Sequence, residues 1–152
     1  LFACKADMNA EIEPDMDNPT DTLTTDQQAI VTKVEASGQD GSYQFRVPIK
    51  SPDTGCDQYA NWWEVITPDG ELVYRRILAH SHVNEQPFKR SGGSVAIAAD
   101  EIVFVRAHMN NKGYGIEVVK GSVVGGFEKA ELAKDFAEEL ATQSPLPERC
   151  AF

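Results

Sequence analysis

From residue 29 to about residue 124, the chain consists of short runs rich in β-branched and aromatic residues, separated by turn-forming residues. Within 43–49, for example, Tyr43, Phe45 and Val47 alternate with other residues, as in a strand with one buried face. Pro68-Asp69-Gly70 predicts a tight turn, because proline fixes the first central angle and glycine accepts a positive φ. We expect strands over 30–36, 43–49, 59–66 and 72–82. A turn at Gly92-Gly93 should lead to strands over 95–98, 102–109 and 116–119, with a shorter run at 122–124.

About seven short strands at this spacing, without alternating helices, predict a mainly β fold. The expected architecture is an antiparallel β-sandwich, immunoglobulin-like or fibronectin-like, with a small jelly-roll barrel as the alternative. After Gly125-Gly126 the apolar residues change to helical spacing, which predicts one C-terminal helix over 127–141 that covers an edge or a face of the sheet. The apolar stripe of this helix would contain Leu132, Ala133, Phe136, Ala137 and Leu140.

Two adjacent tryptophans fall within one predicted strand. Successive side chains on a strand point to opposite faces, so Trp62 and Trp63 should lie on opposite sides of the sheet. We expect one to fill the core and the other to lie at a surface or under the C-terminal helix.

The negative charge is concentrated at the start of the chain. The sequence has a net charge of -10, and residues 1–26 carry seven acidic side chains against Lys5 alone. Few apolar residues are available there for burial, so we expect 5–26 to be a flexible acidic tether before one domain over 27–152. A packed acidic loop, or a calcium loop built on Asp15, Asp17 and Asp21, is the alternative. The acidic balance also excludes nucleic acid as an expected partner.

The first four residues, Leu1-Phe2-Ala3-Cys4, carry a resemblance to a known class. They resemble the lipobox of bacterial lipoproteins, in which a signal peptide ends before a cysteine that is then lipidated. The resemblance implies export, lipidation of Cys4 and attachment to a membrane on the periplasmic or cell surface. A plainly secreted protein, or a buried Cys4, is the alternative.

The two remaining cysteines agree with export. Cys56 and Cys150 form an even pair, which in an exported domain predicts a disulfide that fastens the C-terminal tail to the sheet. Two free thiols in a reducing compartment are the alternative. The sequence contains no Cys-x-x-Cys motif that would indicate redox chemistry.

All three histidines lie in predicted strands or at their ends. Alternation over 72–82 places His80 and His82 on one face, close enough for two imidazoles to bind one ion. His108 ends the strand 102–109, and Glu85 follows His82 by three residues. If these strands are neighbours, His80, His82 and His108 can converge with Glu85 as a fourth ligand or an orienting partner.

This order of residues is similar to the metal motif of cupins, which bind a divalent metal with two histidines, a glutamate and a distant histidine. The gap between His82 and Glu85 is shorter here, and the Pro and Gly before the last histidine of that motif are replaced by residues 103–106. We therefore interpret the likeness as convergent ligand spacing and do not assign the family. The expected metal is Zn, Cu, Fe or Mn. The alternative is a structural histidine pair at a sheet edge, bonded to Glu85 or to backbone carbonyls.

Two further patterns in the sequence bear on chemistry. Arg76 and Arg106 share predicted strand faces with the histidines and could bind an anion, although pairing with the surplus carboxylates is the alternative. No serine, cysteine or paired-carboxylate motif indicates a catalytic residue. We therefore expect an exported, lipid-anchored, non-catalytic binding or structural module, with a metal-binding protein or metalloenzyme as the competing hypothesis.

Overall fold

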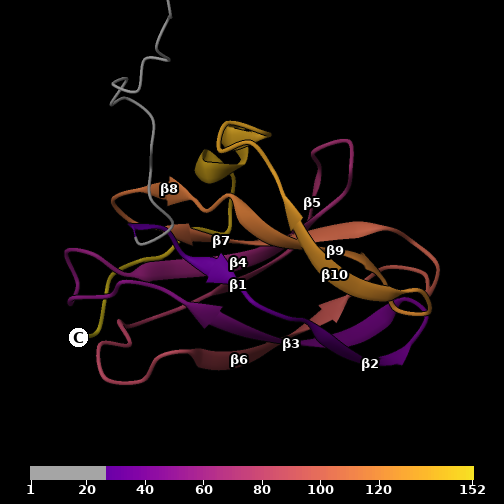
Figure 1. The fold of residues 1–152 in the computed structure, drawn as a ribbon, viewed down its shortest axis with the longest axis horizontal. Helices are drawn as coiled ribbons and strands as arrows, with labels where there is room; N and C mark the ends of the chain where they lie inside the picture. Colours follow the sequence, from indigo (N-terminus) through magenta and orange to yellow (C-terminus); the bar gives the residue numbers. More distant parts are fainter. Residues whose placement is uncertain (1–26) are drawn as a thin grey trace, which may run out of the picture.

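Residues 27–152 are described by a computed structural model, and they form two antiparallel β-sheets that pack face to face (Figure 1). The lipobox-like motif 1–4 and the predicted tether 5–26 lie outside the described residues. Within 27–152, no helix is long and apolar enough to cross a membrane.

The smaller sheet is built around β3 (Ser42–Lys50). Its alternate residues are buried and line the core, so one face of the strand is apolar as the sequence predicts. One edge of β3 pairs with β6 (Phe88–Val95), and the other pairs with β2 (Glu35–Gln39) and β1 (Ile30–Val31).

The larger sheet has β7 (Val103–Met109) and β4 (Ala60–Ile66) at its centre. β5 (Leu72–Ile77) forms the edge beside β4. On the other side, β9 (Glu117–Ser122) and β8 (Gly113–Tyr114) both pair with β7, and β10 (Gly126–Glu131) forms the far edge. Trp63, Val65 and Val105 project from this sheet into the shared core.

The opposite face of the larger sheet is also covered, so every residue of β4 is buried. Trp63 lies in the core between the sheets, while Trp62 lies on the outer face and is only 2% exposed. The predicted division of the two tryptophans is confirmed. The C-terminal segment and its short 3-10 helix η2 (Glu138–Thr142) lie beyond the larger sheet, on the side away from β3 and β6 (Figure 1).

The predicted β-sandwich is confirmed, although 27–152 contains ten strands where about seven were expected. The strand predicted over 30–36 is divided into β1 and β2, and β5 ends at Ile77, before the histidines. Gly92 and Gly93 were predicted to turn the chain, but they lie within β6.

The helix predicted over 127–141 is wrong. Residues 126–131 instead pair with β9 along their whole length, and only η2 is helical in the remainder. Backbone pairing with an open sheet edge outweighed the local helical periodicity in this segment.

Candidate functional site

His80 and His82 lie on a loop between β5 and β6, at one end of the sandwich. This loop is held by backbone bonds on both sides. Leu78 N donates to Asn61 O, Ser81 N donates to Phe152 O, and Ala151 N donates to Ala79 O. The C-terminal tail therefore runs beside the histidine loop and helps to fix it.

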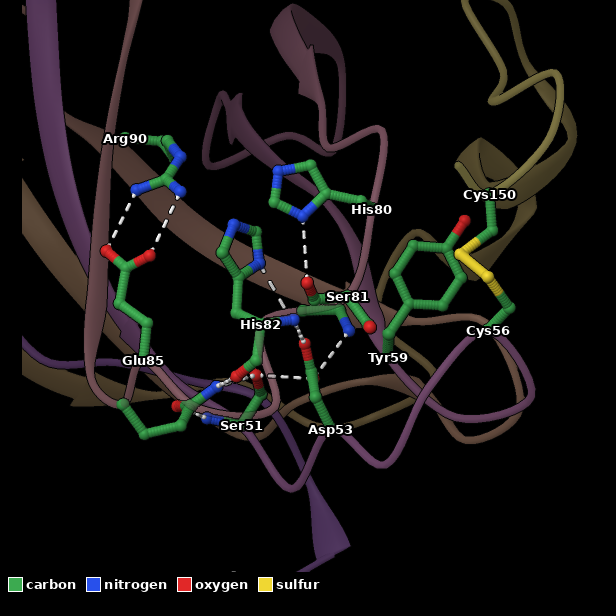
Figure 2. Close-up of polar contacts among 12 residues, drawn as sticks. Ser51, Asp53, Cys56, Tyr59, His80, Ser81, His82, Glu85, Arg90 and Cys150 are labelled. Carbon is green, nitrogen blue, oxygen red and sulfur yellow. Dashed lines mark hydrogen bonds and ion pairs between the residues drawn. A yellow bond between two sulfur atoms is a disulfide. The ribbon is translucent and has the colours of Figure 1, made fainter. Parts of the chain in front are cut away.

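Asp53 joins this loop to the one that follows β3. Its Oδ1 accepts hydrogen bonds from Ser51 Oγ at 2.7 Å and from Ala60 N at 3.0 Å. Its Oδ2 accepts from the backbone N of His82 at 2.8 Å (Figure 2). Gln86 adds two links, because its Oε1 accepts from Ser51 N and its Nε2 donates to His82 O. These bonds fix the backbone position of His82.

Sequence reasoning missed Asp53 as an organising residue. The available signal was the turn Ser51-Pro52-Asp53, since aspartate after proline in a turn commonly bonds to nearby backbone N–H groups. Its bonds to Ala60 and His82, however, join residues seven and twenty-nine positions away. Those contacts depend on the tertiary fold.

Four aromatic or imidazole rings form a stack through the site. The ring centroids of Phe152 and His80 are 4.5 Å apart, those of His80 and His82 are 4.4 Å apart, and those of His82 and Phe88 are 3.8 Å apart. The His82 and Phe88 planes differ by only 6°. The two imidazoles are thus held between two phenylalanine rings.

The ring nitrogens of the two histidines differ in their surroundings. Nδ1 of His80 lies 2.8 Å from the carbonyl oxygen of Ser81 and must carry the proton, because a carbonyl can only accept. Both ring nitrogens of His82 are buried and have no hydrogen-bond partner among residues 27–152. Nδ1 of His82 faces Asp53 Oδ2 at 3.9 Å, which is too long for a hydrogen bond.

An open pocket of about 460 Å³ lies against these residues. His80, His82, Glu85 and Phe152 are among the residues that line it. The carboxylate of Glu85 forms an ion pair with Arg90 at 3.2 Å, beside the imidazoles (Figure 2). The pocket therefore combines two imidazoles, one carboxylate and an exposed aromatic ring.

The charges around the pocket affect two pKa values. Burial lowers the pKa of His82, and the positive charge of Arg90 lowers it further, while Asp53 and Glu85 oppose this effect. The hydrogen bond from Arg90 holds the pKa of Glu85 below its usual value. At neutral pH the site therefore contains a neutral His82 and an ionised Glu85.

His108 does not join the other two histidines. It points to the outer face of the larger sheet, where its ring stacks on Trp62 with centroids 3.8 Å apart and its Nδ1 lies 2.7 Å from Asn61 Oδ1. Burial, and then the charges of Arg75 and Arg106, lower its pKa to about 3. Within residues 27–152, no group of three or more His, Cys, Asp or Glu side chains is arranged to hold a metal ion.

The expected convergence of three imidazoles is thus corrected to a pair. β5 ends at Ile77, so strand alternation does not extend to His80 and His82. The loop brings His80 and His82 together. Strand alternation in β7 instead points the His108 side chain to the outer face of the larger sheet.

Arg76 and Arg106, the predicted anion-binding pair, lie on opposite faces of the larger sheet. Arg76 is opposite Trp63 in the pairing of β4 with β5, and its guanidinium donates to the backbone oxygens of Ser91 and Ile77. Arg106 is buried and donates to Glu64 at 2.9 Å. Arg106 therefore pairs with a carboxylate, which was the alternative to anion binding.

The predicted disulfide between Cys56 and Cys150 is present. Cys56 lies on the loop after Asp53, and Cys150 lies two residues before Phe152. The bond thus holds the C-terminal tail beside the histidine pocket (Figure 2).

A comparison with curated proteins identifies a relative from Halomicrobium mukohataei that is named "Putative lipoprotein". The two sequences are 34% identical over 100 residues, which represent 66% of this chain. The matched region covers 48% of the relative, so the chain spans about half the length of this protein. No protein-family model and no solved structure matches the chain.

Proposed function

We propose that this protein is an exported envelope protein, attached to a membrane by a lipid on Cys4, and that residues 27–152 form a domain that binds a partner without catalysing a reaction. The observation that carries the proposal is the 34% identity to a relative named as a lipoprotein. The lipobox-like sequence Leu1-Phe2-Ala3-Cys4 supplies the residue to which the lipid would be attached.

The disulfide supports export. Cys56 and Cys150 are bonded, and such bonds persist in periplasmic and extracellular proteins but are rare in a reducing cytosol. The sequence has one further cysteine, Cys4, which lies outside this pair.

The acidic tether, residues 5–26, would separate the domain from the membrane. Anionic lipid headgroups would repel the excess carboxylates of this segment. This repulsion would favour a tether that extends away from the membrane surface. A segment of this length reaches at most roughly 75 Å when fully extended. The domain would then face the periplasm or the exterior of the cell.

The histidine pocket supports a binding role for the domain. Val83 and Phe152 line this pocket, and they are 47% and 72% exposed. Exposed apolar side chains that border polar groups are typical of surfaces that bind ligands or partners. The pocket is therefore the first region to test for binding.

Lipid attachment can be tested with an alkyne-bearing fatty acid supplied to cells that express the complete gene. The wild-type protein should incorporate the label and fractionate with membranes, while Cys4→Ser should lose the label and become soluble. The Cys56→Ser/Cys150→Ser variant is the matched cysteine control and should keep the label. Equal labelling and membrane association of the wild type and Cys4→Ser would refute the proposal.

A further inference from the structure

We propose that His80 and His82, together with Glu85, bind one divalent transition-metal ion in the pocket lined by the β5–β6 loop. The three side chains are not already arranged around an ion, so binding would require the imidazoles to rotate and Glu85 to leave Arg90. This inference rests on the proposed binding role of the domain and specifies its ligand class. It excludes His108, which lies on the outer face of the larger sheet.

The first support is the placement of the two imidazoles. Their centroids are 4.4 Å apart, and the planes are tilted by 39°. Figure 2 shows the rings side by side, each with Nε2 on the side away from Asp53 and Ser81. An unprotonated Nε2 on each ring presents a lone pair, and rotation of the two side chains would direct both lone pairs at one ion.

The second support is the orientation of each Nδ1. A metal-binding histidine usually directs its other ring N–H toward a carbonyl or carboxylate, which leaves the ligating nitrogen unprotonated. Nδ1 of His80 donates to Ser81 O, and Nδ1 of His82 faces Asp53 Oδ2. His80 therefore has the partner that keeps its Nε2 available, whereas the Asp53 carboxylate lies 3.9 Å from Nδ1 of His82 and would have to move closer to do the same.

The third support is an unexplained buried group. The His82 side chain is 2% exposed, yet neither ring nitrogen has a partner among residues 27–152. A buried polar atom without a partner is unfavourable, and a bound ion is one of the few explanations for it. Coordination through Nε2 would satisfy one of these nitrogens.

Glu85 is the available carboxylate. It lines the same pocket, and its charge interacts with both imidazoles, although it now pairs with Arg90. The Glu85 and Arg90 side chains are 56% and 28% exposed, so this pair is weak and the carboxylate can turn toward an ion. Two imidazoles and a carboxylate favour Zn²⁺ or Cu²⁺ over Ca²⁺ or Mg²⁺, which prefer oxygen ligands.

The site can be tested by calorimetric titration of the full chain with ZnCl₂, and separately with CuCl₂. A Cys4→Ser background removes the thiol that lies outside the disulfide. We expect one ion per chain. His80→Ala and His82→Ala should each weaken binding by more than about 100-fold, because loss of a ligand exceeds the roughly 10- to 100-fold cost of losing an outer partner.

Three further variants make the test specific. His108→Gln is the matched histidine control and should keep the wild-type affinity, whereas Glu85→Gln should weaken binding and Arg90→Gln should strengthen it. In nitrogen-15 NMR spectra, zinc should shift Nε2 of His80 and His82 while each Nδ1 remains protonated. Equal affinity in the wild type and the two alanine variants, or no effect of Glu85→Gln, would overturn the site. Because Cys4 is absent from these samples, this result is independent of the lipid-attachment test.

Discussion

Glu64 is the residue that organises the outer face of the larger sheet. It is fully buried, and its two oxygens accept hydrogen bonds from Arg75 Nη2 at 2.7 Å and from Arg106 Nε at 2.9 Å. Trp62 Nε1 donates to the same carboxylate at 2.8 Å. One negative charge thus faces two guanidinium groups, and the other N–H groups of those arginines bond to backbone oxygens of the C-terminal segment. These oxygens belong to Phe136, Ala137, Leu140, Gln143 and Pro145.

Replacing Glu64 should therefore be strongly destabilising. Glu64→Gln leaves two buried cations without a counter-charge, and breaking a buried ion pair in this way typically costs about 3 to 5 kcal/mol. Glu71→Gln, which changes an exposed carboxylate, should shift the free energy of unfolding by less than about 0.5 kcal/mol. Urea denaturation of the two variants provides the comparison. Similar stability of both would contradict a central role for Glu64.

His108 should make the stability of the domain depend on pH. Its pKa is about 3 in the folded protein, because of burial and the charges of Arg75, Arg106 and Lys134, against 6.5 as its ordinary value. Below pH 6.5 the unfolded chain binds a proton that the folded protein does not, so stability falls as the pH decreases toward 3. Between pH 7.5 and pH 4 the loss due to this residue should be about 3 kcal/mol.

This effect can be isolated with His108→Gln. Carboxylates contribute equally to the pH dependence of both proteins, so the difference between their unfolding curves reports on His108. The variant should lose less stability than the wild type on acidification. Parallel pH profiles would show that His108 is not held neutral by its surroundings.

At the level of elements, the C-terminal segment shows where local pattern and tertiary structure disagree. The stripe from Leu132 to Leu140 has helical spacing, yet 126–131 forms a strand and the next residues are mostly irregular. The backbone oxygens of Phe136, Ala137 and Leu140 bond to buried arginines, and in a helix these oxygens would accept from N–H groups four residues later. Such partners, thirty or more residues away, cannot be predicted from periodicity.

The strand pattern was a better guide than the helical pattern. β3, β4 and β7 lie within one residue of the predicted runs at each end. β3 has an uninterrupted apolar alternation, and β4 and β7 are mostly apolar runs that are buried almost throughout. The prediction was wrong at Gly92-Gly93, where glycines are needed for close packing within a strand. A Cβ at Gly92 would lie 2.7 Å from Tyr74 Oη and 3.1 Å from Trp63 Cζ2.

Gly92→Ala should therefore destabilise the contact between β6 and β5. An added methyl group in a well-packed region typically costs about 1 to 3 kcal/mol. The neighbouring exposed residue provides a control, since Ser91→Ala should change the free energy of unfolding by less than about 0.5 kcal/mol. Thermal or urea unfolding measures both. A Gly92→Ala variant as stable as Ser91→Ala would show that the packing at this position is loose.

On the scale of the whole molecule, the disulfide connects the C-terminal tail to the loop between β3 and β4. Its cysteines are 94 residues apart in sequence. Cysteine counting predicted the pair, but the sequence could not predict that the tail would also pair with 79–81 and place Phe152 on His80. The histidine pair was predicted from its spacing, whereas the third imidazole was assigned to it wrongly.

Removing the disulfide should release the tail and destabilise the domain. A loop of this length corresponds to about 4.7 kcal/mol in the chain-entropy model, which is an upper value for many proteins. In Cys56→Ser/Cys150→Ser, the backbone amides of Ser81 and Ala151 should lose protection from hydrogen exchange, while those of β4 and β7 should remain protected. Unchanged protection at Ser81 and Ala151 would show that the tail is held without the disulfide.

The most direct test of membrane attachment is mass spectrometry of the N-terminal peptide from protein extracted from its native membranes. If Cys4 is lipidated, the peptide should begin at Cys4 and carry the added mass of a lipid, without Leu1-Phe2-Ala3. An unmodified Cys4 in a peptide that still contains Ala3 would contradict attachment by a lipid on this residue.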